Sequence, residues 1–148
     1  MEQKESKELN QGVIEAYIHQ NKKIGAMVDL RCETDFVART DEFKTLAHEL
    51  CLQIAAMRPQ FINPEDIPGE FLEKEKNKIK EELQKSGKPA KLIEEIVGGK
   101  LEKLKKEICL LSQPWIKDES KTIGDLVQET KAQLKEEILI KRFIRFGI

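Results

Sequence analysis

Apolar and polar residues alternate strictly in two neighbouring stretches near the start of the chain. Apolar residues at every second position predict a half-buried β-strand. The alternating apolar residues are Ile14, Ala16 and Ile18 in the first stretch, and Ile24, Ala26, Val28, Leu30 and Cys32 in the second. Between them lies the polar segment 20–23, whose Asn21 tolerates the positive φ of a turn. The pattern predicts a β-hairpin.

The apolar spacing changes to three and four residues after residue 40, which predicts an amphipathic helix. The residues at this spacing are Phe43, Leu46, Ala47, Leu50, Cys51, Ile54 and Ala55. Thr40 is the expected N-cap, because Asp41 and Glu42 follow it and face the positive end of the helix dipole. Arg58-Pro59 ends the predicted helix, since proline restricts the residue before it.

Two further helices are predicted in a segment rich in Lys and Glu, between residues 70 and 107. Ser86-Gly87 ends the first helix and Pro89 opens the second. The charged run is expected to be a solvated helix face. Gly98-Gly99 inside the second helix costs about 1 kcal/mol per glycine relative to alanine. A close approach of another backbone is one explanation for the pair.

The last part of the chain returns to strand-like patterning. Residues 108–115 are apolar and expected to be extended, and Thr122 is expected to cap a short helix. In the closing segment, Ile138, Ile140, Ile144 and Phe146 alternate with Leu139, Lys141, Phe143 and Arg145. This third strand must pair with the hairpin to be stable. The predicted fold class is therefore α+β: a small three-stranded antiparallel sheet with helices packed on it.

Composition narrows the classes of function. The 148 residues suffice for one domain, and 26 Lys and Arg nearly balance 27 Asp and Glu. A general nucleic-acid binder would need a surplus of cations, so we expect no direct contact with nucleic acid. No stretch approaches the ~20 consecutive apolar residues of a membrane span, and the polar start lacks a signal-peptide centre. We expect a cytoplasmic protein that does not enter membranes.

The residues offer little for catalysis. His48 and Cys51 lie three positions apart on the predicted helix, but a structural zinc site needs four ligands and no second pair has suitable spacing. Cys51 belongs to the apolar stripe, where a buried, inert thiol is the ordinary case. We therefore expect no metal, no cofactor and no intrinsic enzyme activity. A thiol enzyme using Cys51 or Cys32 is a competing hypothesis.

The segment from Arg31 to Arg39 joins a predicted strand to a predicted helix. Thr34 or Asp35 can cap a short first turn, which would leave Phe36 and Val37 at an exposed helical N-terminus. An exposed aromatic residue there has the form of a binding anchor. Alternatively, Phe36 folds back into the core as a hydrophobic staple. The residues alone leave both interpretations open.

This segment is also the strongest of several blocks that together resemble the elongation factor Ts family. Thr34-Asp35-Phe36-Val37-Ala38, preceded by Leu30-Arg31-Cys32-Glu33, resembles the signature of that family. Further blocks follow in the family's order and extend the resemblance from about Gly12 to the C-terminus. They are Tyr17-Ile18-His19, Ile24-Gly25, Pro59-Gln60-Phe61-Ile62, Pro64-Glu65-Asp66-Ile67, Ser86-Gly87-Lys88-Pro89, Gln113-Pro114-Trp115, Ser120-Lys121-Thr122-Ile123-Gly124 and Phe143-Ile144-Arg145-Phe146.

The resemblance implies a guanine nucleotide exchange factor that promotes GDP release from GDP-bound elongation factor Tu. Thr34, Asp35, Phe36 and Val37 map onto the family motif, and Phe36 is implied to insert near the partner's magnesium. Asp35 either adds charge there or only caps the turn. His19 falls at a position implied to touch the partner's GTP-binding domain. A purely structural interaction or dimerisation module is the alternative.

Two departures from the family pattern shape the expected domain organisation. Family members normally begin with a small ubiquitin-associated-like helical domain, and we expect no counterpart of it in these residues. Residues 1–11 resemble only the remnant of the linker that follows it. Either the core is truncated or the lineage has lost that domain; we favour truncation and expect a single domain over residues 12–148. The single sheet-and-helix unit is similar to the short type of the family, which implies a homodimer.

Overall fold

Residues 8–148 are described in a computed structural model, and they form two compact units. The first combines the chain up to Arg58 with Pro114–Ile148, and the second is Pro59–Gln113. Of the linker expected over residues 1–11, positions 1–7 lie outside the described residues. The single domain over residues 12–148 stays a prediction.

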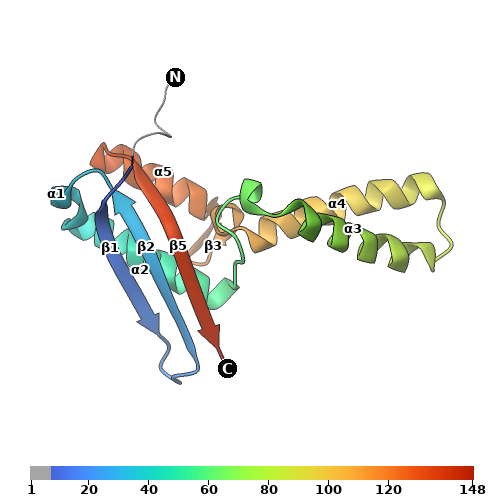
Figure 1. The fold of residues 1–148 in the computed structure, drawn as a ribbon, viewed down its shortest axis with the longest axis horizontal. Helices are drawn as coiled ribbons and strands as arrows, with labels where there is room; N and C mark the ends of the chain where they lie inside the picture. Colours follow the sequence, from blue (N-terminus) through green and yellow to red (C-terminus); the bar gives the residue numbers. More distant parts are fainter. Residues whose placement is uncertain (1–7) are drawn as a thin grey trace. The chain divides into compact units, whose positions relative to one another are not determined.

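The first unit is built on a sheet whose strands are antiparallel throughout. Within residues 8–148, β1 (Gln11–Ile18), β2 (Ile24–Cys32) and β5 (Ile138–Gly147) form a three-stranded sheet in the order β1-β2-β5. Figure 1 shows β2 between the other two strands. The predicted hairpin and closing strand are thus confirmed, and with them the α+β fold class.

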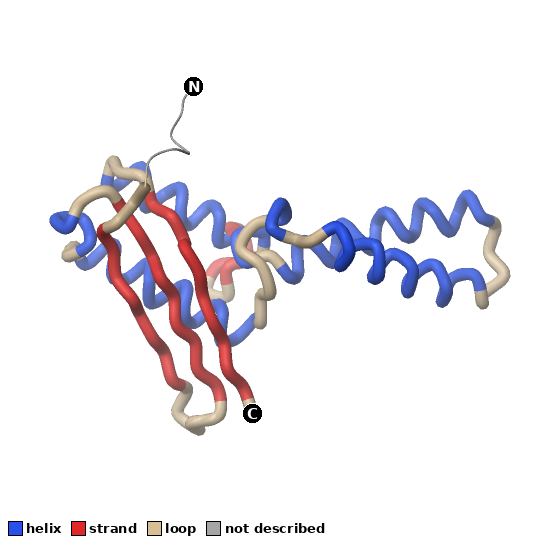
Figure 2. Tube along the Cα trace, in the orientation of Figure 1, coloured by secondary structure: helices blue, strands red, loops and turns tan. Residues whose placement is uncertain are grey.

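Two helices, α2 (Asp41–Met57) and α5 (Ile123–Leu134), lie behind this sheet (Figures 1 and 2). Both begin at the threonines expected to cap them. Thr40 Oγ1 accepts a hydrogen bond from Phe43 N at 3.2 Å, and Thr122 Oγ1 accepts one from Asp125 N at 3.1 Å. The core lies between the layers. It is formed by Val28, Leu30 and Cys32 of β2 and by Phe43, Leu46, Leu50 and Ile54 of α2.

The apolar side chains of β1 face away from the helices, whereas a row of apolar residues normally faces the core. Its register pairs Tyr17 with Ala26 and Glu15 with Val28, which puts these β1 residues on the helix-covered side. Since the side-chain period of a strand is two, Ile14 and Ile18 then face away from the helices, where both are exposed.

β5 changes face part-way along its length. Asp29 pairs with Arg142 but Leu30 pairs with Ile140, so one extra residue, Lys141, forms a bulge. Ile138 and Ile140 are buried against the helices, whereas Ile144 and Phe146 lie on the exposed side. The even spacing of these apolar residues therefore does not put them on one face, because the bulge reverses the alternation.

The segment before α5 differs from the expected extended structure. After α4 ends at Ile108, Leu110–Ser112 form a 3-10 helix, and β3 (Pro114–Trp115) then pairs with β4 (Asp118–Thr122) in a two-stranded sheet. A run of apolar residues alone does not distinguish a buried turn from a strand.

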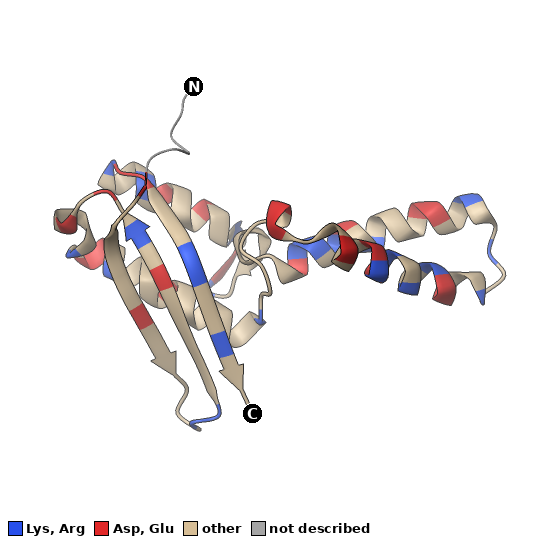
Figure 3. Ribbon diagram, viewed as in Figure 1, with Lys and Arg blue, Asp and Glu red and all other residues tan. Residues whose placement is uncertain are grey.

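The second unit is a helical hairpin. α3 (Gly69–Gln84) packs against α4 (Ala90–Ile108), with a 3-10 turn at Pro64–Asp66 before them. Its small core joins Phe61, Ile67, Phe71, Leu72, Leu104, Ile108 and Cys109. Charged residues cover both helices (Figure 3). The ion pairs Lys78–Glu75 and Lys105–Glu102 each join two residues one helical turn apart. The expected solvated face is confirmed.

Gly98 and Gly99 are not explained by a close approach of another backbone. A Cβ built on either glycine meets no described atom within 4 Å outside its own helix backbone. This side of α4 is open, so the glycines reduce the intrinsic stability of the helix without allowing a closer contact in the part of the chain that the structure describes.

Candidate functional site

A four-residue helix, α1 (Asp35–Ala38), follows β2 at one end of the sheet. Of the two candidate caps, Thr34 is the one that the structure uses. Its backbone is extended, and its Oγ1 accepts a hydrogen bond from Val37 N at 3.2 Å. Arg39 closes the helix, with its N–H directed at the carbonyl groups of Asp35 and Phe36. The motif of residues 34–37 is therefore a single capped turn.

Phe36 projects from this turn into solvent, with 80% of its surface exposed. Val37 and Ala38, the next residues, are buried in the core at 5% and 3% exposure. Phe36 thus does not fold back as a hydrophobic staple. The expectation that Val37 shares its exposure is wrong, because a turn of helix points successive side chains in directions about 100° apart. Val37 anchors the turn in the core, and Phe36 projects from it into solvent.

Charged side chains flank the aromatic ring. Asp35 Oδ2 and Arg39 Nη2 form an ion pair of 2.6 Å across one helical turn, and both side chains are largely exposed. Such a pair contributes little to stability in water. Asp35 also lies in the first turn, where a negative charge favours the helix dipole. It therefore has a structural role on the turn in the free protein.

Glu136 is a residue of this site that the sequence did not reveal. It lies between α5 and β5, and its carboxylate accepts hydrogen bonds from Glu33 N, Thr34 N and Thr34 Oγ1, more than 100 positions earlier in the chain. A single sequence carries no signal for such a pair, because neither spacing nor periodicity links the two segments.

His19 lies at the other end of the sheet. It follows β1, whose last residue Ile18 pairs with Gly25, whereas α1 follows Cys32, which pairs with Gln11. Eight residues of strand separate the two ends by about 25 Å. The structure therefore does not bring His19 together with Phe36, and any partner that touches both must span the sheet.

The histidines have local partners of their own. His19 Nδ1 and the Tyr17 hydroxyl are joined by a hydrogen bond of 2.7 Å, and His48 Nδ1 lies 3.2 Å from Glu15 Oε2. The rings of Tyr17 and His48 meet edge to face, with centroids 6.3 Å apart. His48 thus pairs with Glu15 on the strand, and no group of three or more potential metal ligands occurs among residues 8–148.

The cysteines are poorly suited to nucleophilic chemistry. Cys32, Cys51 and Cys109 are free thiols, and all are buried. Burial raises the pKa of the Cys51 thiol to about 12, with the Glu15 charge adding to the effect. Burial also raises the pKa of Cys32 and of Cys109. Because the thiolate is the nucleophile, these environments argue against the thiol-enzyme hypothesis.

A family model described as "Elongation factor TS" matches residues 1–148 of the chain. The chain belongs to the elongation factor Ts family. The resemblance carried by the motif blocks is therefore confirmed at the level of the family. In addition, no helix among the described residues is long and apolar enough to cross a membrane.

Curated relatives agree with this assignment. The chain is 48% identical over 147 residues to an elongation factor Ts from Coprothermobacter proteolyticus, covering 99% of this chain and 75% of that protein. It is 50% identical over 137 residues to one from Thermoanaerobacter sp., covering 93% and 67%. It is also 50% identical over 147 residues to one from Thermodesulfovibrio yellowstonii, covering 99% and 73%.

Proposed function

We propose that the chain is a guanine nucleotide exchange factor that promotes the release of GDP from elongation factor Tu. Membership of the elongation factor Ts family supports the reaction and the partner. The observation that carries the mechanism is the 80% exposed Phe36 on a capped turn whose next residue is buried. Exchange of this kind forms and breaks no covalent bond, so the chain needs no catalytic group and no cofactor of its own.

In this mechanism Phe36 inserts between helices of the partner's GTP-binding domain, near the magnesium that GDP requires. A buried aromatic anchor typically contributes 2 kcal/mol or more to an interface. That binding energy favours an arrangement of the partner that holds magnesium and phosphate poorly. Because coupling between two ligands is reciprocal, the bound nucleotide weakens the affinity for the exchange factor by the same factor.

The other motif residues support the anchor. Thr34 caps the turn and Val37 secures it in the core, while Asp35 presents its carboxylate beside Phe36. His19, exposed at the far end of β1, is proposed as a second and separate contact with the partner.

Labelled GDP release from elongation factor Tu tests this function directly. In a stopped-flow experiment with excess unlabelled GDP, we expect the wild-type chain to accelerate release in proportion to its concentration, until the rate saturates. Release at the intrinsic rate at every concentration would contradict the proposal.

The compartment expected for such a translation factor is the cytoplasm, and no direct contact with nucleic acid or membrane is part of the mechanism.

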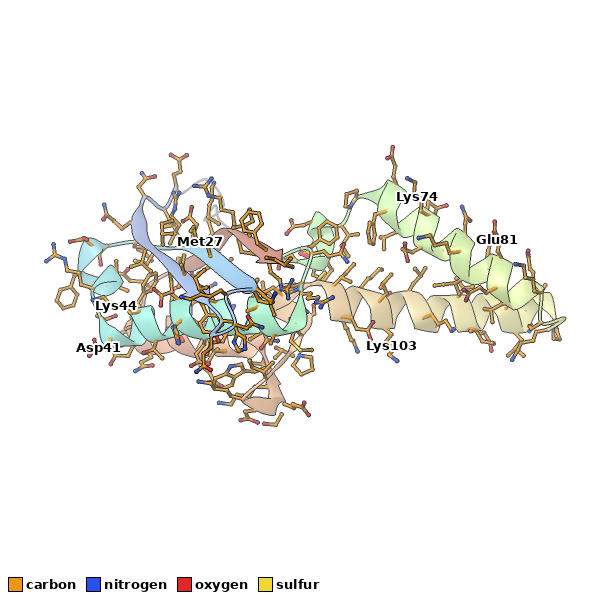
Figure 4. All side chains as sticks on the ribbon, turned by 90° about the horizontal axis from the view of Figure 1, so that it is seen from below. Met27, Asp41, Lys44, Lys74, Glu81 and Lys103 are labelled. Atoms are coloured by element: carbon orange, nitrogen blue, oxygen red, sulfur yellow. The ribbon has the colours of Figure 1, made fainter. Side chains whose placement is uncertain are left out.

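A homodimer is proposed as the assembled form, and the outer face of the sheet supports it. This face is the one that carries Met27 and points away from α2 (Figure 4). It exposes a cluster of apolar residues. They are Ile14, Ile18, Met27, Ile144 and Phe146. Contiguous exposed apolar surface of this kind marks an interaction site. A second copy fits it because a two-fold interface sets the same patch against itself, apolar strip on apolar strip.

The alternative of a purely structural module requires the motif to pack internally and the charged helices to mediate assembly. The exposure of Phe36 disfavours its first part. A pull-down with GDP-bound elongation factor Tu separates the two, because only the exchange factor is expected to retain that partner.

A further inference from the structure

The turn that carries Phe36 is too short to be stable by itself. α1 has four residues, and the first hydrogen-bonded turn of a helix is the costly one to form. The exposed ring of Phe36 has little packing in the free protein that could hold its backbone. Beyond the burial of Val37 and Ala38, the conformation of this turn therefore depends on what binds the residues just before it.

Glu136 makes those contacts. Its Oε1 accepts from Glu33 N and from Thr34 N, both at 3.1 Å, and its Oε2 accepts from the Thr34 hydroxyl at 2.7 Å. Hydrogen bonds to a charged acceptor are among the stronger ones in proteins. They take up backbone N–H groups that lie ahead of the helix and need a partner outside it.

The contact with Thr34 is transmitted to the turn itself. By donating to Glu136, the Thr34 hydroxyl is oriented with its lone pairs free to accept from Val37 N. This chain of two hydrogen bonds runs from the carboxylate of Glu136 to the residue that follows Phe36. The Cys32 thiol also donates to the Thr34 carbonyl, at 3.2 Å, from the core side.

A reciprocal contact ties the two loops together. Glu33 Oε2 accepts a hydrogen bond from Glu137 N at 2.7 Å, in the opposite direction to the contacts of Glu136. The adjacent strand ends are paired as well, Cys32 with Ile138. The loop before β5 is thus a rigid support on the last residues of β2 and the start of α1.

We propose that Glu136 is a positioning residue for nucleotide exchange, which holds the Phe36 turn in its partner-binding conformation before the partner arrives. The inference rests on the exchange function proposed above. Without Glu136 the turn must be ordered during binding, and that ordering reduces the affinity. The loss therefore appears mainly in the concentration of factor needed for half-maximal GDP release, and less in the maximal rate.

Amide hydrogen exchange of the free chain tests the support without any partner. We expect Glu136→Ala to accelerate exchange at residues 33–37 about tenfold, a factor that corresponds to the loss of charged hydrogen bonds. Glu136→Gln, which keeps an accepting oxygen, should fall between wild type and Glu136→Ala. Glu137→Gln is the matched control, because it makes the same change one residue later, where the side chain pairs with Lys131, and leaves the backbone contact of Glu137 intact.

GDP release from elongation factor Tu tests the consequence. We expect Glu136→Ala to raise the half-saturating concentration about tenfold, with partial recovery in Glu136→Gln and no change in Glu137→Gln. In a Phe36→Ala background, Glu136→Ala should have almost no further effect, because both changes act through one contact. If Glu136→Ala fails to fold, Glu136→Gln provides the same comparisons.

Several outcomes would overturn the proposal. Unchanged amide exchange at residues 33–37 in Glu136→Ala would show that Glu136 does not hold the turn. Equal kinetic effects of Glu136→Gln and Glu137→Gln would make Glu136 an ordinary loop residue. Additive effects of Glu136→Ala and Phe36→Ala would place its action elsewhere. A wild-type chain that does not accelerate GDP release would instead overturn the exchange function, which the amide measurement does not depend on.

Discussion

Asp29 of β2 and Arg142 of β5 face each other across the sheet, and Asp29 Oδ2 accepts a hydrogen bond from Arg142 Nε at 3.1 Å. The same carboxylate accepts from Arg31 Nε at 2.8 Å and from Arg31 Nη2 at 3.1 Å. Asp29 is buried beneath these two guanidinium groups at the position where the register of β5 shifts. One carboxylate therefore bridges two guanidinium cations beside the bulge.

This pairing predicts a pH dependence of stability. Hydrogen bonding to Arg31, opposed in part by burial and aided by Arg142, lowers the pKa of Asp29 from its usual 3.8. A lowered pKa in the folded state means that the stabilisation is present above about pH 4 and disappears as the pH falls through the folded-state pKa. We expect Asp29→Asn to lower the free energy of unfolding by about 2 kcal/mol at pH 7. Denaturant unfolding should show the gap to wild type closing as the pH falls below about 4, and a constant gap would contradict the assignment.

Phe36→Ala separates binding from folding. Because 80% of the ring is already in solvent, we expect its removal to leave the free energy of unfolding almost unchanged. Stimulated GDP release should slow about 30-fold at limiting factor, the equivalent of a 2 kcal/mol anchor. Leu92→Ala on α4 also removes an exposed apolar side chain and serves as the control. Equal release rates for Phe36→Ala and wild type would refute the anchor.

Val37→Ala should show the opposite pattern. Val37 is buried at 5% exposure, so deleting two methyl groups leaves a cavity and is expected to destabilise the fold by about 2 kcal/mol. Thermal unfolding would detect this loss directly. At a temperature where the variant remains folded, its GDP-release rate should stay closer to wild type than that of Phe36→Ala. A larger kinetic effect at unchanged stability would mean that Val37 touches the partner.

Ile144→Lys tests the proposed dimer. Ile144 lies opposite Met27 on the outer face of the sheet and is exposed in the single chain, so a lysine is tolerated there by the monomer. In a dimer the same lysine would be buried in an apolar interface, which is costly. Sedimentation at micromolar concentration should give a dimer mass for wild type and a monomer mass for the variant. A monomer mass for wild type would contradict the dimer itself.

Thiol reactivity provides an independent check on the buried cysteines. With a pKa of about 12, the Cys51 side chain is almost entirely in the thiol form at pH 8. We expect iodoacetamide to modify the native chain at least 100-fold more slowly than the unfolded chain, in which the thiols have ordinary pKa values. One rapidly alkylated thiol in the native state would revive the thiol-enzyme hypothesis.

Local chemistry in the sequence predicted most of the first unit. Thr40 and Thr122 cap their helices as expected, and the alternation in β2 identifies its buried face, because caps and alternation depend on residues a few positions apart. The bulge at Lys141 and the outward face of β1 depend on the register between strands, which no local pattern encodes. For the same reason Phe36 could be singled out but its exposure could not be decided.

The support of the Phe36 turn by Glu136 also has a consequence for folding. These segments are joined across 103 positions of the chain, as are β2 and β5 across a similar separation. Contacts between such distant segments close large loops and form late, after local hairpins and helices. During synthesis the hairpin of β1 and β2 leaves the ribosome long before Glu136 does. The nascent chain therefore carries the Phe36 segment without the support of Glu136 until β5 joins the sheet.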